Sequence, residues 1–115
     1  MNDIKIKGLR PTMRVKKRFL RIRVISSTQF DFKTLSYAIN NYLLKQLGVY
    51  EFGNVGVWII REKFNQQDQE LVLKVSVQGV EKVRAFLALP FSIEKHTVHC
   101  ECQRVSGTLK GVLEK

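Results

Sequence analysis

The sequence predicts an α+β fold in which two amphipathic helices cover one face of an antiparallel four-stranded sheet. Segments whose apolar residues alternate with polar ones, as in strands, are interleaved with segments whose apolar residues recur every three to four positions, as in helices. Their order is β-α-β-β-α-β, followed by a short C-terminal helix, which is the ferredoxin-like topology. With 115 residues, of which 44% are hydrophobic, the chain is the size of one domain with one core.

The predicted ferredoxin-like domain occupies residues 14–115 and follows an N-terminal arm. Residues 1–13 lack a regular pattern and contain a glycine and a proline, so we expect a basic arm rather than a helix or strand. Residues 18–26 form the first strand. Leu20, Ile22 and Val24 form one face, and the other face consists of Phe19, Arg21, Arg23 and Ile25.

The first helix has the most regular pattern in the chain and covers residues 31–47. Four aliphatic residues recur at every fourth position and would form one buried stripe: Leu35, Ile39, Leu43 and Leu47. Asp31 is placed to cap the first turn, and Gly48 is placed to end the helix.

The middle of the chain is predicted to form a β-hairpin. A glycine-containing bend at residues 53–56 precedes a strand at 57–64, which is apolar on both faces and is therefore expected in the centre of the sheet. Residues 65–69 are polar and form the turn. Residues 70–77 alternate cleanly, with Leu71, Leu73, Val75 and Val77 facing inward and Val72, Lys74 and Ser76 facing outward.

The second helix and the last strand complete the domain. Residues 79–89 have helical spacing, and Pro90 ends them. Residues 96–104 form the last strand, which turns three residues toward the core: Val98, Cys100 and Cys102. The opposite face of the sheet would then present Arg21, Arg23, Lys74, His99, Glu101 and Gln103.

The charge of the chain points to a polyanionic partner. The formal net charge is +10 at pH 7, and the isoelectric point is about 10.0. Before residue 27, nine cations are opposed only by Asp3, which leaves +8 on the first 26 residues. These cations are Lys5, Lys7, Arg10, Arg14, Lys16, Lys17, Arg18, Arg21 and Arg23. Because the charge continues into a strand, we interpret it as a binding surface rather than a solvated tail.

Two functions that share this topology are disfavoured by the residues present. An RNA recognition motif stacks bases on aromatic residues of its third strand, and the segment ELVLKVSV has none. Trp58 lies on the second strand, and we assign it to the core rather than to base stacking. An acylphosphatase needs an arginine in the loop after the first strand, and the loop SSTQF has no cation. On this ferredoxin-like, or RRM-like, fold, contact between basic side chains and phosphates is therefore favoured over base stacking.

No catalytic or metal site is predicted. The candidate zinc ligands in HTVHCEC do not converge, because His99 points away from His96, Cys100 and Cys102 on a strand. None of the serines has a neighbouring pattern that would activate it as a nucleophile. The two cysteines form no disulfide framework, which predicts a reducing, cytoplasmic location. No segment has the pattern of a secretion signal or a membrane span.

Four segments carry a resemblance to a known family. They are LRPTMRVKKRFLRIRVI, NYLLKQLGVYEFGNVGVWIIR, VEKVRAFLAL and VSGTLK. The most specific pieces are the RPT-x-R-x-K-x-R entry at residues 10–18 and the SGT at residues 106–108. In this order, over residues 9–110, the segments are similar to the Pop-five family, the small protein subunits of archaeal and eukaryal ribonuclease P. The length resembles that of an archaeal member.

The resemblance implies a function and a set of partners. In that family the catalyst is the RNA subunit, which uses magnesium ions to remove the 5′ leader from precursor tRNA. The protein is an RNA-binding subunit with no catalytic residues and no cofactor of its own. Its expected partners are the ribonuclease P RNA, the precursor tRNA and a thirty-kilodalton TIM-barrel-like subunit. With that subunit the chain is expected to form a two-plus-two heterotetramer. A contact between two copies of the chain is a further expectation.

The expected RNA-binding residues are the cations of the arm and first strand together with the C-terminal motif. They are Arg10, Arg14, Lys16, Lys17, Arg18, Arg21, Arg23, Ser106, Gly107, Thr108 and Lys110. An alternative for Arg21 and Arg23 is ion pairing with Glu62 or Glu101 across the sheet.

The C-terminal motif and the overall function each have an alternative as well. Ser106 or Thr108 could cap the last helix, which Gly111 would weaken, instead of contacting a phosphate. A ferredoxin-like module that senses proteins or small molecules is the alternative function. It would need few cations, so the charge of +10 argues against it.

Overall fold

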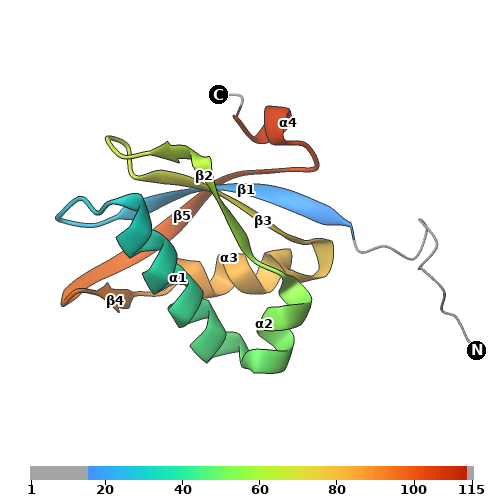
Figure 1. Cartoon of the computed structure of the whole chain (residues 1–115), viewed down its shortest axis with the longest axis horizontal. Helices are drawn as coiled ribbons and strands as arrows, with labels where there is room; N and C mark the ends of the chain where they lie inside the picture. The colour runs from blue at the N-terminus through green and yellow to red at the C-terminus, as the bar shows by residue number, and fades with distance from the viewer. Residues whose placement is uncertain (1–15, 114–115) are drawn as a thin grey trace, which may run out of the picture.

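The computed structural model describes residues 16–113, which form a sheet with helices on both of its faces (Figure 1). The five strands are β1 (Lys17–Ile25), β2 (Trp58–Asn65), β3 (Glu70–Ser76), β4 (Phe91–Ile93) and β5 (His96–Ser106). They pair antiparallel in the order β2-β3-β1-β5-β4. The predicted arm at residues 1–13, which includes Arg10, lies outside the described residues. Arg14 lies outside them as well.

The helices divide between the two faces of the sheet. They are α1 (Phe32–Leu47), α2 (Val49–Val55), α3 (Val80–Ala88) and α4 (Leu109–Leu113), and a 3₁₀ turn at Val77–Gly79 precedes α3. In Figure 1, α1, α2 and α3 cover one face, whereas the short α4 lies against the other. Among residues 16–113, no helix combines the length and apolar character needed to cross a membrane.

The prediction of four strands was wrong by one, because β4 is too short to show a pattern. Its three residues pair with the start of β5. The turn between the two strands places Glu94 and Lys95 at φ values of 49° and 73°. Phe91 and Ile93 are buried beside α1, so this small hairpin closes the edge of the core.

The predicted bend at residues 53–56 is instead the end of helix α2. Gly53 lies within the helix, and Gly56 ends it in the left-handed conformation with φ of 62°. Val55 is 2% exposed and anchors the helix to the core. Burial of this one side chain outweighs the low helix propensity of the glycine.

Strand β2 lies at the edge of the sheet, which corrects its predicted central position. Only one of its faces is covered: Ile59 packs against the core, whereas Trp58 is 68% exposed. The interior strand of the hairpin is β3, where Val72 and Ser76, predicted to face outward, are also buried. Val77, predicted to face inward, lies beyond the strand in the 3₁₀ turn and is 38% exposed.

The core lies between the sheet and the helices α1 and α3. Its fully buried members include Leu20, Ile22, Leu35, Ile39, Leu43, Leu71, Leu73, Val75, Val83 and Leu87, as the alternating and helical patterns predicted. Asp31 caps α1 as predicted: its Oδ1 accepts a hydrogen bond of 2.9 Å from the amide of Thr34. Hydrogen bonding by the side chain of Thr34, and next by its amide, lowers the pKa of the Asp31 carboxyl.

A buried glutamine fastens the loop before α1 to the turn between β2 and β3. Gln69 Oε1 accepts from the amide of Phe30 at 2.9 Å, and Gln69 Nε2 donates to the carbonyl oxygens of Phe30 at 3.0 Å and of Gln66 at 2.7 Å. These bonds satisfy a polar side chain that is only 6% exposed.

Candidate RNA interface

Arg21 and Arg23 of the predicted site lie on the face of the sheet opposite α1, α2 and α3, which we call the outer face. On β1 the alternate aliphatic residues are at most 4% exposed and face the helices, so Phe19, Arg21 and Arg23 face the other way. Arg23 is exposed and Arg21 is half-buried. The two side chains are separated by about 7 Å along a rigid strand, as the rise per residue of a strand dictates.

A third arginine joins this face through a bulge in β5. The register pairs Ile22 with Cys102 but Arg21 with Arg104, so Gln103 is an extra residue in β5. Strict alternation from Cys102 would have placed Arg104 on the core face. The bulge turns it to the outer face directly opposite Arg21, and the sequence prediction therefore missed it.

Arg23 has a different environment from Arg21. Its register partners are Glu70 on β3 and Glu101 on β5, so two carboxylates stand directly across from it. Among the residues that the structure describes, no ion pair within 4.0 Å joins Arg23 to either of them. Arg23 therefore stands opposite Glu101, as the alternative of ion pairing predicted, but no salt bridge joins these two residues in the described part of the chain.

Trp58, assigned to the core by the sequence analysis, is on the outer face. Its register partner is Lys74, which is followed across the sheet by Phe19 on β1 and Ser106 on β5. The Nζ atom of Lys74 lies 5.9 Å from the centre of the Phe19 ring. The core assignment failed because it rested on a central position for β2.

The cations at the start of β1 lie next to two glycine-containing segments. Lys16 is exposed. Lys17 Nζ lies 3.2 Å from the point where a Cβ on Gly56 would be, and Arg18 Nη1 lies 3.7 Å from the corresponding point on Gly107. Arg18 Nη1 also donates to the backbone oxygen of Lys17 at 3.1 Å. Strand β1 therefore places Arg18 beside the C-terminal motif.

The hydroxyls of the C-terminal motif bind backbone amides at the start of α4. Ser106 Oγ accepts from the amide of Thr108 at 3.2 Å, and Thr108 Oγ1 accepts from the amide of Gly111 at 3.0 Å. This is the capping alternative. A Cβ at Gly111 would overlap Ser106 Oγ, so the glycine that was expected to weaken α4 permits its capping. Lys110 is exposed on the same helix.

The histidines and cysteines of β5 differ in burial: Cys100 is buried in the core, His99 and Cys102 are half-buried, and His96 is exposed. Cys100 is 2% exposed, and burial raises the pKa of its thiol to about 12. Burial also raises the pKa of Cys102. His96 packs edge-on against Phe30, with ring centres 5.9 Å apart. Within residues 16–113, no group of three or more His, Cys, Asp or Glu side chains is placed to hold a metal ion.

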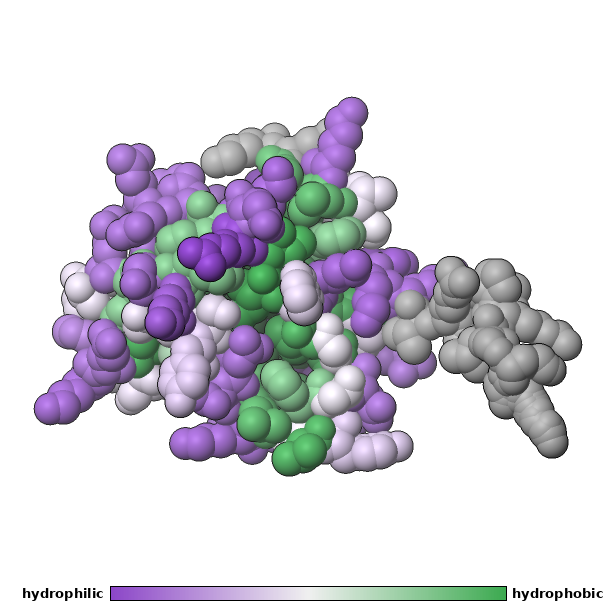
Figure 2. Space-filling view, viewed as in Figure 1, coloured by the Kyte–Doolittle hydropathy of each residue, from purple (hydrophilic) through white to green (hydrophobic). Residues whose placement is uncertain are grey.

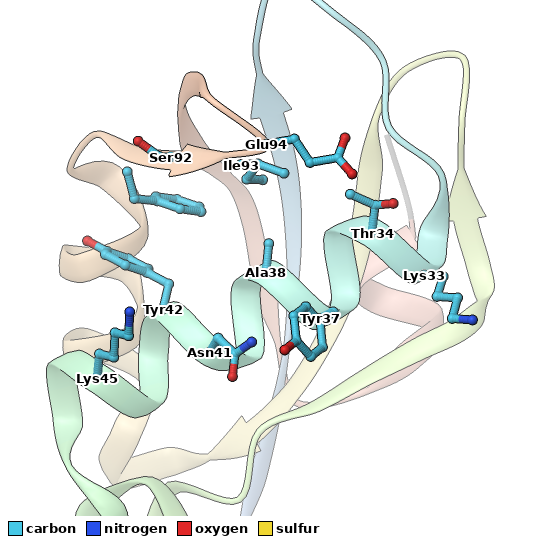
Figure 3. A pocket seen from close by; sticks show the side chains of 11 residues that line it. Lys33, Thr34, Tyr37, Ala38, Asn41, Tyr42, Lys45, Ser92, Ile93 and Glu94 are labelled. Carbon is cyan, nitrogen blue, oxygen red and sulfur yellow. The ribbon is translucent and has the colours of Figure 1, made fainter.

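The helix side of the molecule carries a separate groove between α1 and β4 (Figure 3). It has a volume of about 700 Å³, and its floor contains Tyr42, whose ring stacks on Phe91 with centres 4.1 Å apart. Figure 2 shows apolar side chains at the foot of this side, where α1 meets α2. Val49 and Tyr50 of α2 are 80% and 83% exposed. The basic outer face and these apolar features thus lie on opposite sides of the sheet.

Comparison with known proteins identifies the family. The model of the Rpp14/Pop5 family matches residues 15–115. Ribonuclease P protein component 2 of Pyrococcus furiosus is 32% identical over 109 residues, which cover 95% of this chain and 89% of that protein. The protein of the same name from Thermococcus gammatolerans is 31% identical over 111 residues, which cover 96% and 91%.

A solved structure has the same fold. One chain in the cryo-EM structure of yeast ribonuclease MRP superimposes with a TM-score of 0.66 at 12% identity, and the match covers 84% of this chain and 78% of that one. At this identity the likeness concerns the fold alone. The matched family model spans all of the described residues, and the chain belongs to the Rpp14/Pop5 family.

Proposed function

We propose that this chain is an RNA-binding protein subunit of ribonuclease P and supports the RNA-catalysed removal of the 5′ leader from precursor tRNA. The observation that carries the proposal is the full-length similarity to archaeal proteins named ribonuclease P protein component 2, together with membership of the Rpp14/Pop5 family. A subunit of a ribonucleoprotein needs a surface for RNA, and the charge of +10 supplies its electrostatic basis.

The outer face is the surface we assign to RNA. Arg21 and Arg104 stand directly opposite each other on neighbouring strands, and in this proposal their guanidinium groups contact phosphates of the RNA backbone. The end of the face near Arg23 is less basic, because Glu70 and Glu101 flank that arginine. We therefore expect the RNA backbone to lie over the Arg21 end of the face.

The protein itself takes no part in bond cleavage in this proposal. The thiols of Cys100 and Cys102 on β5 are potential nucleophiles. Burial raises the pKa of both, which disfavours the reactive thiolate. The magnesium ions that the reaction needs are held by the RNA subunit. The specific partners we propose are the ribonuclease P RNA, the precursor tRNA and the thirty-kilodalton TIM-barrel-like subunit in a two-plus-two assembly.

Reconstitution of cleavage tests the proposal. Ribonuclease P RNA is incubated with precursor tRNA and limiting magnesium, and this chain, the TIM-barrel-like subunit, or both are added. We expect faster removal of the 5′ leader only when both proteins are present. An unrelated basic protein of equal net charge controls for simple charge screening. No increase with both proteins, or an equal increase with the control protein, would contradict the proposed function.

A further inference from the structure

The tryptophan of β2 is exposed on the outer face without a role in the core. Trp58 is the single tryptophan of the chain and is 68% exposed at the start of an edge strand. Its register partner Lys74 lies between Leu73 and Val75, which face the core, so Trp58 and Lys74 share the outer face. A large indole held on a rigid strand and left uncovered offers a flat surface to a ligand.

Trp58 begins a row of aromatic and basic side chains across the sheet. The register continues from Trp58 to Lys74, Phe19 and Ser106. Directly opposite residues of an antiparallel pair have Cβ atoms about 5 Å apart, so one basic group stands between two aromatic residues in the register, at Trp58, Lys74 and Phe19. Lys74 Nζ lies 5.9 Å from the centre of the Phe19 ring, so the ammonium group of the residue opposite Trp58 lies over that ring.

Cations lie on both sides of this row. On one side, Lys17 Nζ lies 3.2 Å from the Cβ position of Gly56, two residues before Trp58. On the other side, Arg21 and Arg104 pair across β1 and β5. Glu70 and Glu101, which flank Arg23, lie farther from Trp58, because Arg23 is two residues beyond Arg21 on β1. The cations nearest to Trp58 are therefore Lys74 and Lys17, because the next row toward Arg21 and Arg104 begins with Ile60 and Val72.

We propose that Trp58 is a stacking platform for an unpaired RNA base, with Lys74 and Lys17 holding the phosphates beside it. An indole stacks on any base, and the adjacent cations fix the backbone. Paired bases keep their faces inside a duplex, so the ligand is a single-stranded segment. A protein could also cover an exposed tryptophan, but the neighbouring cations Lys74 and Lys17 favour RNA. This inference rests on the proposed function and adds a direct base contact to the phosphate contacts.

The fluorescence of the single tryptophan reports on this contact directly. The full chain is titrated with a short unstructured polypyrimidine RNA, with the duplex formed by that RNA and its complement, and with inorganic polyphosphate. We expect the single strand to quench the emission and to protect Trp58 from iodide. The duplex and the polyphosphate are expected to bind with little quenching, because neither presents an open base.

Two substitutions separate stacking from exposure alone. Trp58→Ala should weaken binding of the single-stranded RNA roughly 5- to 150-fold, the range measured for loss of one base stack, whereas Trp58→Phe should retain most of the affinity. The matched control is Tyr50→Ala, which removes an aromatic residue that is 83% exposed on the helix side. Thermal unfolding of each variant verifies that the fold is retained.

The outcomes distinguish this inference from the proposed function. Tight RNA binding without quenching, or with equal affinity for Trp58→Ala and wild type, would overturn the stacking platform and leave the ribonuclease P role intact. Quenching by the TIM-barrel-like subunit alone, with no effect of RNA, would assign Trp58 to a protein contact and would also overturn it. Absence of any RNA binding would contradict both.

Discussion

Replacing Gly111 with alanine tests how the C-terminal motif holds α4. In a solvent-exposed helix this change usually stabilises the helix by about 1 kcal/mol. Here the added Cβ would overlap Ser106 Oγ and lie 2.9 Å from Thr108 Oγ1, so both hydroxyls must move. We therefore expect the opposite sign, which is a loss of stability.

The size of the loss follows from the contacts that the hydroxyls make. Two hydrogen bonds, from the amides of Thr108 and Gly111, would be broken, and each contributes about 1 kcal/mol. Less the usual gain of alanine, the net loss is about 1 kcal/mol if α4 stays in place. If α4 detaches, the fully buried Val112 is exposed as well, which adds about 2 kcal/mol.

Urea unfolding followed by circular dichroism measures this loss. Lys110→Ala is the matched control on the same helix, and it should change stability by less than about 0.5 kcal/mol because the side chain is exposed. The double variant Ser106→Ala/Gly111→Ala should be more stable than the sum of the single losses predicts, because the overlapping oxygen is gone. A Gly111→Ala protein as stable as wild type would refute the capping geometry. Weakened RNA binding by Ser106→Ala at unchanged stability would show that the hydroxyl contacts phosphate instead.

Three further predictions concern the core, the buried glutamine and catalysis. Cys100→Ala and Cys102→Ala should each lower stability by about 1 kcal/mol, and stoichiometric zinc in the purified protein would contradict their role in packing. Burial raises the pKa of Cys100 from 9.0 to about 12, so the stability that the neutral thiol contributes is complete below pH 9.0 and is lost as the pH rises toward 12. Cys100→Ala should therefore reduce the loss of folding stability between pH 9.0 and pH 12. Gln69→Ala should lower stability by about 2–4 kcal/mol, because both backbone groups of Phe30 lose their hydrogen-bond partner. Gln67→Ala, at an exposed neighbouring position, should leave stability unchanged. Equal stability of the two variants would show that the hydrogen bonds of Gln69 to Phe30 do not stabilise the fold. The pure protein should not remove the 5′ leader of precursor tRNA in magnesium, and correct cleavage without the RNA subunit would show that it is itself catalytic.

The elements with a regular pattern could be predicted from the sequence, because their patterns record burial. The alternation in β1 and the four-residue repeat in α1 each identified side chains that the structure buries, such as Leu20 and Leu35. The cap at Asp31 and the end at Gly48 were also confirmed. Short elements such as α2 and β4 were missed, since seven and three residues are too few to establish a period.

The candidate site depended on long-range pairing that a single sequence does not contain. The outward direction of Arg21 and Arg23 followed from alternation along one strand. The position of Arg104 depends on a bulge in β5, which is visible only when β5 is paired with β1. The exposure of Trp58 depends on β2 being at the edge, which is a property of strand order and not of its composition.

The salt dependence of RNA affinity tests most directly whether the outer face binds ribonuclease P RNA. The affinities of wild type, Arg21→Ala/Arg104→Ala and Lys33→Ala/Lys45→Ala are measured across a salt series with the TIM-barrel-like subunit present. The two double variants lose the same charge, but Lys33 and Lys45 are exposed on α1, on the helix side.

If the outer face holds phosphates, the arginine variant should bind more weakly, and the slope of log affinity against log salt should flatten by about one to two units. The lysine variant should keep the wild-type slope. An arginine variant that binds like wild type at every salt concentration, or a lysine variant that loses as much, would contradict the assignment of RNA to this face.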